Sequence, residues 1–202
     1  ALSAELGMCC GGQMTVFIEP LEAKPNLIIF GAGHIGQALA RQGVALDFQV
    51  FVADPRESLL RPDHFQKEVT LIADYTAYDL NRLPFSEKTY VVVVTHDHQI
   101  DQKLVELVLR KPFRYAALVG SLRKARLTVQ RCLNKEFQPE EITKLLCPAG
   151  LDIGAQSPEE IAVSIMGQIT QCRNHVEETP FWQGTLTEIQ KALSSKDQES
   201  VA

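Results

Sequence analysis

The chain has 202 residues, 45% of them hydrophobic and 22% charged, which is typical of a globular protein with a sizeable core. A formal net charge of −5 argues against a nucleic-acid binder, because neutralising phosphates requires a basic surface. No apolar run approaches the ~20 residues that span a bilayer, and no signal peptide is visible. Five scattered cysteines without C-x-x-C or zinc spacing indicate a reducing compartment. We therefore expect a cytoplasmic protein that contacts neither nucleic acid nor membrane.

Residues 1–22 are expected to form an N-terminal arm. Residues 1–12 contain Gly7-Met8-Cys9-Cys10-Gly11-Gly12, and the alternation over residues 14–20 then predicts an edge strand. Glycine-flanked thiols would be accessible, so Cys10 could be reactive or bind a ligand. Small residues in a simple turn would explain the same spacing.

A strand followed by a glycine-rich turn is the strongest local pattern. Four apolar residues at 27–30 predict a buried strand, and the turn from Gly31 to Gly36 has the form G-x-G-x-x-G before a helical pattern. In this motif Gly31 permits a tight turn, Gly33 lets backbone approach a phosphate, and Gly36 lets the helix lie close to the sheet. The helix N-terminus then offers free N–H groups to an anion. A glycine-rich turn can also be only a packing device.

The next strand strengthens this interpretation. An apolar run at 48–52 is followed by Asp54, 18 residues after Gly36, where a dinucleotide fold places the acid that bonds ribose hydroxyls. Arg56 could bond a phosphate or a pterin-like edge, or could be a solvated loop arginine. We predict a Rossmann-type unit that captures a phosphorylated molecule; the alternative is the same fold with an empty crevice.

Three further apolar runs, at residues 69–72, 90–94 and 115–119, complete five predicted strands. Right-handed crossovers then give an α/β fold, a Rossmann-like doubly wound parallel sheet of order 3-2-1-4-5. We expect this domain over residues 23–175.

The domain is predicted to end in a long helix from Pro158 to about His175, with Ser157 and Glu160 in a capping box. Residues 176–202 are expected to form a polar, partly helical tail. Phe181 and Trp182 in this tail could dock on a second copy, and we expect a homodimer.

Polar residues gather where the later strands end, which is where ligands bind in such sheets. Thr95-His96-Asp97-His98 follows the fourth strand, and Gly120-Ser121 precedes a basic helix that could hold an anion or be a solvated face. The histidines with Asp101 invite a metal interpretation, but side chains two residues apart in a turn need not converge. We expect a polar lid over the ligand and no metal site.

The candidate cofactor-binding residues are Gly31, Gly33, His34, Ile35, Gly36, Asp54, Arg56, Thr95, His96, Gly120, Ser121 and Cys10. His34 lies inside the turn, so its ring should face ligand or solvent. Nothing resembles a nucleophile with its base, or a pair of acids, so we predict no catalytic residue.

Several stretches between about residues 5 and 175 together resemble the xanthine dehydrogenase accessory protein family (XdhC/CoxI). They are Gly7-Met8-Cys9-Cys10-Gly11-Gly12, Phe30-Gly31-Ala32-Gly33-His34-Ile35-Gly36, Asp54-Pro55-Arg56, Thr95-His96-Asp97-His98 with Asp101, Val119-Gly120-Ser121 with Lys124, Gly150-Leu151-Asp152-Ile153-Gly154-Ala155, and Pro158-Glu159-Glu160-Ile161-Ala162. Members usually carry a longer N-terminal domain, of which only the final stretch is present here.

The resemblance implies an accessory protein, not an enzyme. Such a chaperone would bind molybdopterin, support its sulfuration by a cysteine desulfurase, and insert the molybdenum cofactor into a xanthine dehydrogenase-type molybdenum hydroxylase. Two alternatives stay open from the residues alone: an NAD(P)-dependent oxidoreductase and a nucleotide-sensing regulatory protein. Asp54 favours an unphosphorylated ribose, whereas Arg56 could tolerate a 2′-phosphate.

Overall fold

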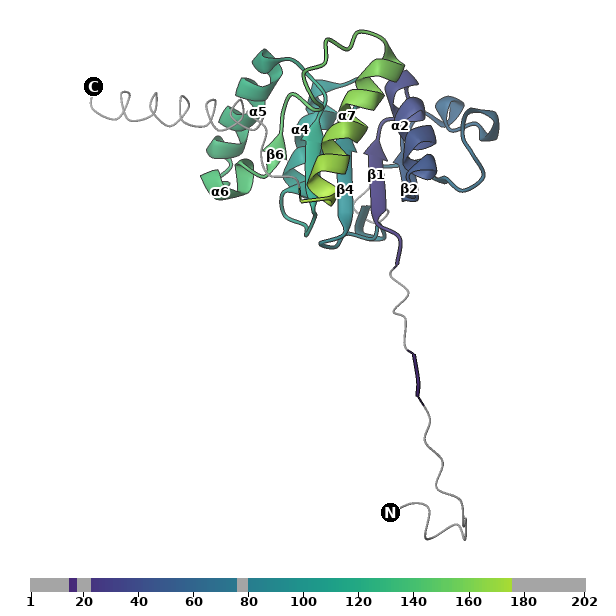
Figure 1. Cartoon of the computed structure of the whole chain (residues 1–202). Helices are drawn as coiled ribbons and strands as arrows, with labels where there is room; N and C mark the ends of the chain where they lie inside the picture. Colours follow the sequence, from purple (N-terminus) through teal and green to yellow (C-terminus); the bar gives the residue numbers. More distant parts are fainter. Residues whose placement is uncertain (1–14, 18–22, 76–79, 176–202) are drawn as a thin grey trace, which may run out of the picture.

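A six-stranded parallel sheet forms the centre of the protein in the computed structural model, which describes residues 15–17, 23–75 and 80–175 (Figure 1). The strand order is β3-β2-β1-β4-β5-β6, and every neighbouring pair is parallel. The strands are β1 (Asn26–Phe30), β2 (Gln49–Ala53), β3 (Thr70–Ile72), β4 (Thr89–Val93), β5 (Tyr115–Leu118) and β6 (Leu145–Leu146). The predicted α/β class and the order of the first five strands are confirmed.

Helices cover both faces of this sheet. They are α2 (His34–Ala45), α4 (His98–Val108), α5 (Leu122–Asn134), α6 (Pro139–Ile142) and α7 (Pro158–Arg173), with short 3₁₀ turns η1 (Glu57–Leu59) and η2 (Pro62–His64). Helices α2 and α7 lie side by side on one face (Figure 1) and α4 and α5 pack on the other. This is the doubly wound arrangement.

The core explains why the strands are apolar at nearly every position. In β1, Leu27 and Ile29 pack under α2 and α7, whereas Ile28 and Phe30 pack under α4 and α5, and all four are fully buried. Strand β4 is likewise buried at all five positions. Sheets with helices on both faces require such continuous apolar strands.

Two expectations about the ends of the sheet need correction. Strand β6 was not predicted, because two leucines are too short a signal; its pairing with β5 (Ala116 with Leu145) places it at the sheet edge. The edge strand predicted over residues 14–20 is wrong for residues 15–17, which form no strand and are exposed. The other residues of the arm, including Cys10, lie outside the described residues, as does the tail after His175.

The helix from Ser157 has the predicted capping box. The Ser157 hydroxyl accepts a hydrogen bond from the Glu160 N–H at 3.3 Å, and the Glu160 carboxylate accepts one from the Ser157 N–H at 2.9 Å. Within the described residues, the chain contains no helix with the length and apolar character that crossing a membrane requires.

The carboxyl ends of the central strands meet at one edge. Hydrogen bonds continue one residue beyond the strands, from Gly31 N to Ala53 O at 2.8 Å and from Val94 N to Phe30 O at 2.8 Å. A third such bond runs from Val119 N to Val93 O. The loops that carry most of the candidate residues therefore start side by side.

Candidate functional site

The glycine turn between β1 and α2 is built for close packing on one side and open space on the other. Gly31 has φ +123°, and a Cβ there would overlap the backbone of Val94; a Cβ at Gly36 would overlap the carbonyl of Gly31. A Cβ at Gly33, in contrast, would meet no atom of the described chain within 4 Å. Packing therefore requires Gly31 and Gly36, whereas the space in front of Gly33 can receive a ligand.

Helix α2 starts at this open space without a side-chain cap. Gly33 is its N-cap residue, and no described side chain hydrogen-bonds to the first turn. The N–H groups at the start of an α-helix have no partner within the helix and carry a partial positive charge. Ile35 is half-buried and His34 is exposed, as expected for a ring that faces ligand or solvent. This helix end can bind a phosphate through its backbone.

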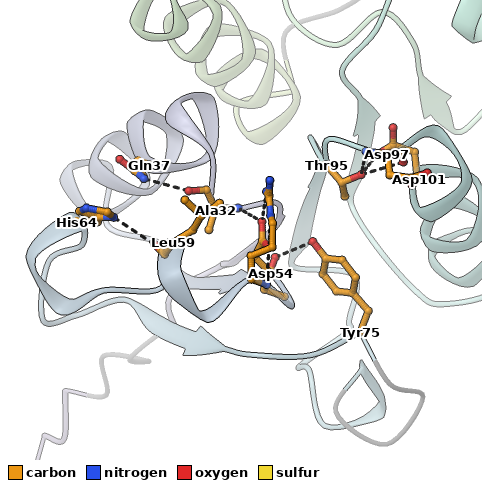
Figure 2. Close-up of polar contacts among 11 residues, drawn as sticks. Ala32, Gln37, Asp54, Leu59, His64, Tyr75, Thr95, Asp97 and Asp101 are labelled. Atoms are coloured by element: carbon orange, nitrogen blue, oxygen red, sulfur yellow. Dashed lines mark hydrogen bonds and ion pairs between the residues drawn. The ribbon is translucent and has the colours of Figure 1, made fainter.

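Asp54 connects this turn to Arg56. Its carboxylate oxygen Oδ2 accepts hydrogen bonds from Ala32 N at 2.8 Å (Figure 2) and from Arg56 Nη2 at 2.6 Å. Oδ1 accepts from Arg56 Nε at 2.8 Å and from Arg56 N at 3.0 Å. Asp54 is only 1% exposed. Burial on its own would raise the pKa of Asp54, but the hydrogen bonds from Arg56 and Ala32 outweigh it and hold the pKa below the usual value.

This geometry changes how the two residues can act. Both oxygens of Asp54 are already engaged, so a ribose could bond to this carboxylate only by displacing Arg56. Arg56 is held in a bidentate pair, but its side chain is 36% exposed and its Nη1 donates to no described residue. A fixed, half-exposed guanidinium beside an uncapped helix N-terminus favours an anionic ligand. Tyr75 contacts the same segment, because its hydroxyl donates a hydrogen bond to the carbonyl oxygen of Ala53, the residue before Asp54, at 3.1 Å (Figure 2).

Thr95 belongs to a second network, at the ends of β4 and β5. Its hydroxyl lies 2.7 Å from Asp101 Oδ1 and 3.0 Å from Asp97 O, and accepts from Asp97 N at 3.2 Å (Figure 2). Asp101 is 1% exposed, and its Oδ2 faces Lys124 Nζ at 2.6 Å. Lys124 also donates to Val119 O at 2.7 Å. The hydroxyl of Thr95 thus holds the β4–α4 turn in place.

The remaining candidates in this region lie on the outside of that network. His96 is exposed, as is His98, whose Nδ1 lies 3.8 Å from Asp101 Oδ2. Ser121 is the N-cap of α5, where its Oγ accepts from Lys124 N at 3.4 Å, and the stem of Lys124 lies against Gly120. Among the described residues, no group of three His, Cys, Asp or Glu side chains could hold a metal ion.

The sequence did not predict a hollow that the structure shows at the carboxyl edge of the sheet. It has a volume of about 400 Å³ and is lined by residues 147–155 together with Leu122, Leu146, Ile161 and Ser164. The Gly150-Leu151-Asp152-Ile153-Gly154-Ala155 motif that contributes to the family resemblance forms its wall, and that motif was the available signal. A second hollow of about 470 Å³ lies between α4 and α5 and includes Gly120 and Ser121.

The structure therefore divides the candidate residues into two groups. Gly31, Gly33, His34, Asp54 and Arg56 meet at the ends of β1 and β2. Thr95, His96, Gly120 and Ser121 lie at the ends of β4 and β5, around the Asp101–Lys124 pair.

Comparison with known proteins agrees with this fold. A protein of Bacillus subtilis strain 168, named as a probable subunit of xanthine dehydrogenase, is 34% identical over 161 residues, which cover 80% of this chain and 47% of that protein. The uncharacterized protein YqeB of Escherichia coli K12 is 32% identical over 171 residues, 84% of this chain and 31% of that protein.

A solved structure described as a xanthine dehydrogenase from Bacillus halodurans superposes with a TM-score of 0.66 at 32% identity. It covers 80% of this chain and 46% of that one, so the chain spans less than half the length of each of these relatives. Residues 27–169 match the model of the XdhC Rossmann domain, and this chain belongs to that family.

Proposed function

We propose that this protein is an accessory factor of a xanthine dehydrogenase-type molybdenum enzyme and binds the phosphate-bearing pterin of its cofactor, molybdopterin. One observation carries the proposal: the N-terminus of α2 is uncapped and faces open space at Gly33. The guanidinium of Arg56, fixed by Asp54, lies beside the same turn. The names of two relatives, which refer to xanthine dehydrogenase, support the choice of client enzyme.

The residues present fit the phosphate end of such a ligand. Backbone N–H groups and a helix dipole bind an anion without a dedicated side chain, and Gly33 lets the phosphate come close. Because the carboxylate of Asp54 is engaged with Arg56 and Ala32, this end suits a phosphate better than a ribose. The cofactor would supply redox chemistry to the client enzyme, whereas this chain would hold and orient it.

The proposal assigns no catalytic residue to this chain. A cysteine desulfurase would deliver sulfur while the pterin is held, and the client would then accept the cofactor. Cys10 remains a candidate ligand from the sequence, and assembly as a homodimer remains an expectation; both concern residues outside the described ranges.

The test is a binding experiment under anaerobic conditions. Purified protein is mixed with molybdopterin and passed over a gel-filtration column, and the bound pterin is measured by fluorescence after oxidation. We expect co-elution with the wild type and at least a tenfold loss with Gly33→Val, because its side chain would fill the phosphate space. Ala45→Val, at the opposite exposed end of α2, is the matched control and should bind normally.

The competing dinucleotide function is measured in the same series. NADH is titrated by its own fluorescence, and Arg56→Ala would relax the constraint on the Asp54 carboxylate. Micromolar NADH binding by the wild type together with no retention of molybdopterin would overturn the proposal. It would favour the NAD(P)-dependent alternative.

A further inference from the structure

The hollow lined by residues 147–155, which follow β6, has the features of a ligand subsite. Its walls are mainly apolar, and two leucine-sized side chains at the hollow, Leu122 and Ile153, are 52% and 54% exposed. A volume of about 400 Å³ is in the range of small-molecule sites, which combine apolar walls with a few polar groups.

The loop that forms the hollow is held rigidly from beneath. Gly150 has φ +92°, and its N–H donates to Gln168 Oε1 at 2.9 Å, a buried oxygen that also accepts from the Tyr115 hydroxyl at 2.6 Å. The Leu151 carbonyl accepts from Ser164 Oγ at 2.6 Å. A loop tied at successive residues to α7 is pre-organised for binding.

Asp152 is the only acidic residue among the described residues that line this hollow. Asp54 and Asp101 are buried and paired, whereas Asp152 is not. Its side chain forms no hydrogen bond or ion pair with any residue that the structure describes, and it is exposed. A carboxylate has two acceptor oxygens and binds best to two parallel N–H donors, as in its bidentate pairs with arginine. The ring of a 2-amino-4-oxopyrimidine presents such a pair, through its ring N–H and its amino group.

The location matches the proposed ligand. Strand β6 is three positions from β1 in the sheet, and parallel strands lie about 4.8 Å apart, so the hollow and the α2 N-terminus are separated by roughly 10–15 Å. Both lie at the carboxyl edge of the sheet, where an elongated cofactor binds across the strands.

We propose that residues 147–155 form the subsite for a 2-amino-4-oxopyrimidine ring, with Asp152 accepting its two N–H donors and Leu122 and Ile153 packing on its faces. This inference rests on the proposed function, since the ring would belong to the ligand whose phosphate lies at α2. A pterin and a guanine share this ring, and the test distinguishes them.

The experiment exploits a reversal of preference. Fluorescence titrations compare 6-hydroxymethylpterin with 6-hydroxymethyllumazine, in which an oxygen replaces the 2-amino group. The wild type should bind the pterin at least about tenfold more tightly, because a site that pairs with an N–H group rejects an analogue without it. Asp152→Asn should reverse the preference, because an amide can accept from the ring N–H while donating to the 2-oxygen. A variant that merely fails to fold would lose binding of both rings and could not reverse the preference between them.

Asp47→Asn is the matched control, because Asp47 is exposed at the far end of α2 and has φ 63°, which asparagine tolerates. It should keep the wild-type preference. Equal preference for the two rings in wild type and Asp152→Asn, or no measurable binding of either ring or of GMP, would overturn the inference. Asp152-dependent binding of GMP without binding of the pterin would keep the ring chemistry and assign it to a guanine nucleotide.

The two proposals fail in different ways. If molybdopterin binds the wild type and Asp152→Asn equally, and Gly33→Val abolishes that binding, the proposed function stands and the Asp152 subsite is wrong. If molybdopterin fails to bind while 6-hydroxymethylpterin binds in an Asp152-dependent manner, the ring subsite stands and the phosphate site at α2 is wrong.

Discussion

Alanine substitutions at the three glycines of the β1–α2 turn should separate the glycines needed for packing from the one needed for binding. Gly36→Ala places a methyl group against the carbonyl of Gly31, and Gly31→Ala places one against the backbone of Val94. Backbone atoms cannot swing aside as side chains do, so the turn or the helix must shift. Gly33→Ala meets open space at φ −70°, a conformation that alanine adopts freely.

The expected magnitudes follow from these contacts. Overpacking a core costs about 1–3 kcal/mol even where side chains can yield, so we expect a loss of about 3 kcal/mol for Gly36→Ala. Gly31→Ala should cost at least as much, because its φ of +123° adds strain for any residue with a Cβ. Gly33→Ala should cost about 0.5–1 kcal/mol, since alanine is a poorer N-cap than glycine.

Urea unfolding followed by circular dichroism measures these free energies. In a domain of this size, a loss of about 3 kcal/mol lowers Tm by roughly 6–12 °C. Gly33→Ala should nevertheless weaken phosphate binding despite its small effect on stability, because its methyl group enters the open space proposed for the ligand. The reasoning is refuted if Gly36→Ala unfolds within about 1 kcal/mol of the wild type, or if Gly33→Ala is as destabilised as Gly36→Ala.

Three further outcomes are expected. Asp54→Asn should lower the free energy of unfolding, measured in urea at pH 7, by about 1.5–3 kcal/mol. Because folding lowers the pKa of Asp54, this difference in stability from the wild type should be present above pH ~4 and should shrink as the pH falls further. A difference that grows below pH ~4 would contradict the reasoning. Lys124→Met should cost about 3–5 kcal/mol by leaving Asp101 buried without its counter-ion, and adding Asp101→Asn should restore part of that loss; a strictly additive double mutant would contradict the pairing. Burial raises the pKa of Cys147 to about 12, so peptide mass spectrometry should find it unalkylated by iodoacetamide at pH 8 until urea unfolds the protein; rapid labelling of the native state would show that the thiol is accessible.

The strands were predictable because each is encoded by its own residues. The apolar run of β4 was expected at residues 90–94 and is observed at Thr89–Val93, since burial on both faces leaves no polar position to obscure it. The glycine spacing of the β1–α2 turn and the capping box at Ser157 are similarly local. Strand β6 escaped prediction because it exists only through its pairing with β5.

The polar residues were harder to predict, because their roles depend on which hydrogen-bond partners the folded backbone brings within reach. The spacing after Gly36 indicated a carboxylate for a ribose, but the folded chain gives Asp54 two partners, Ala32 and Arg56. Thr95 was expected to face a ligand, and its hydroxyl instead bonds to Asp101. Apart from Cys10, which lies outside the described residues, the candidate residues lie at or just after strand ends, whereas their hydrogen-bond partners were not part of the prediction.

The amino-acid sequence by itself determined the class of fold and the glycine turn, since apolar runs and glycine spacing are local. The handedness rule for crossovers between parallel strands then gave the order of the first five strands. Only the tertiary structure decided which charges pair, such as Asp101 with Lys124, and where a hollow forms behind β6. The physical reason is that a buried charge takes the partner that packing brings within hydrogen-bonding distance, and for Asp101 of α4 that partner lies on another helix, α5.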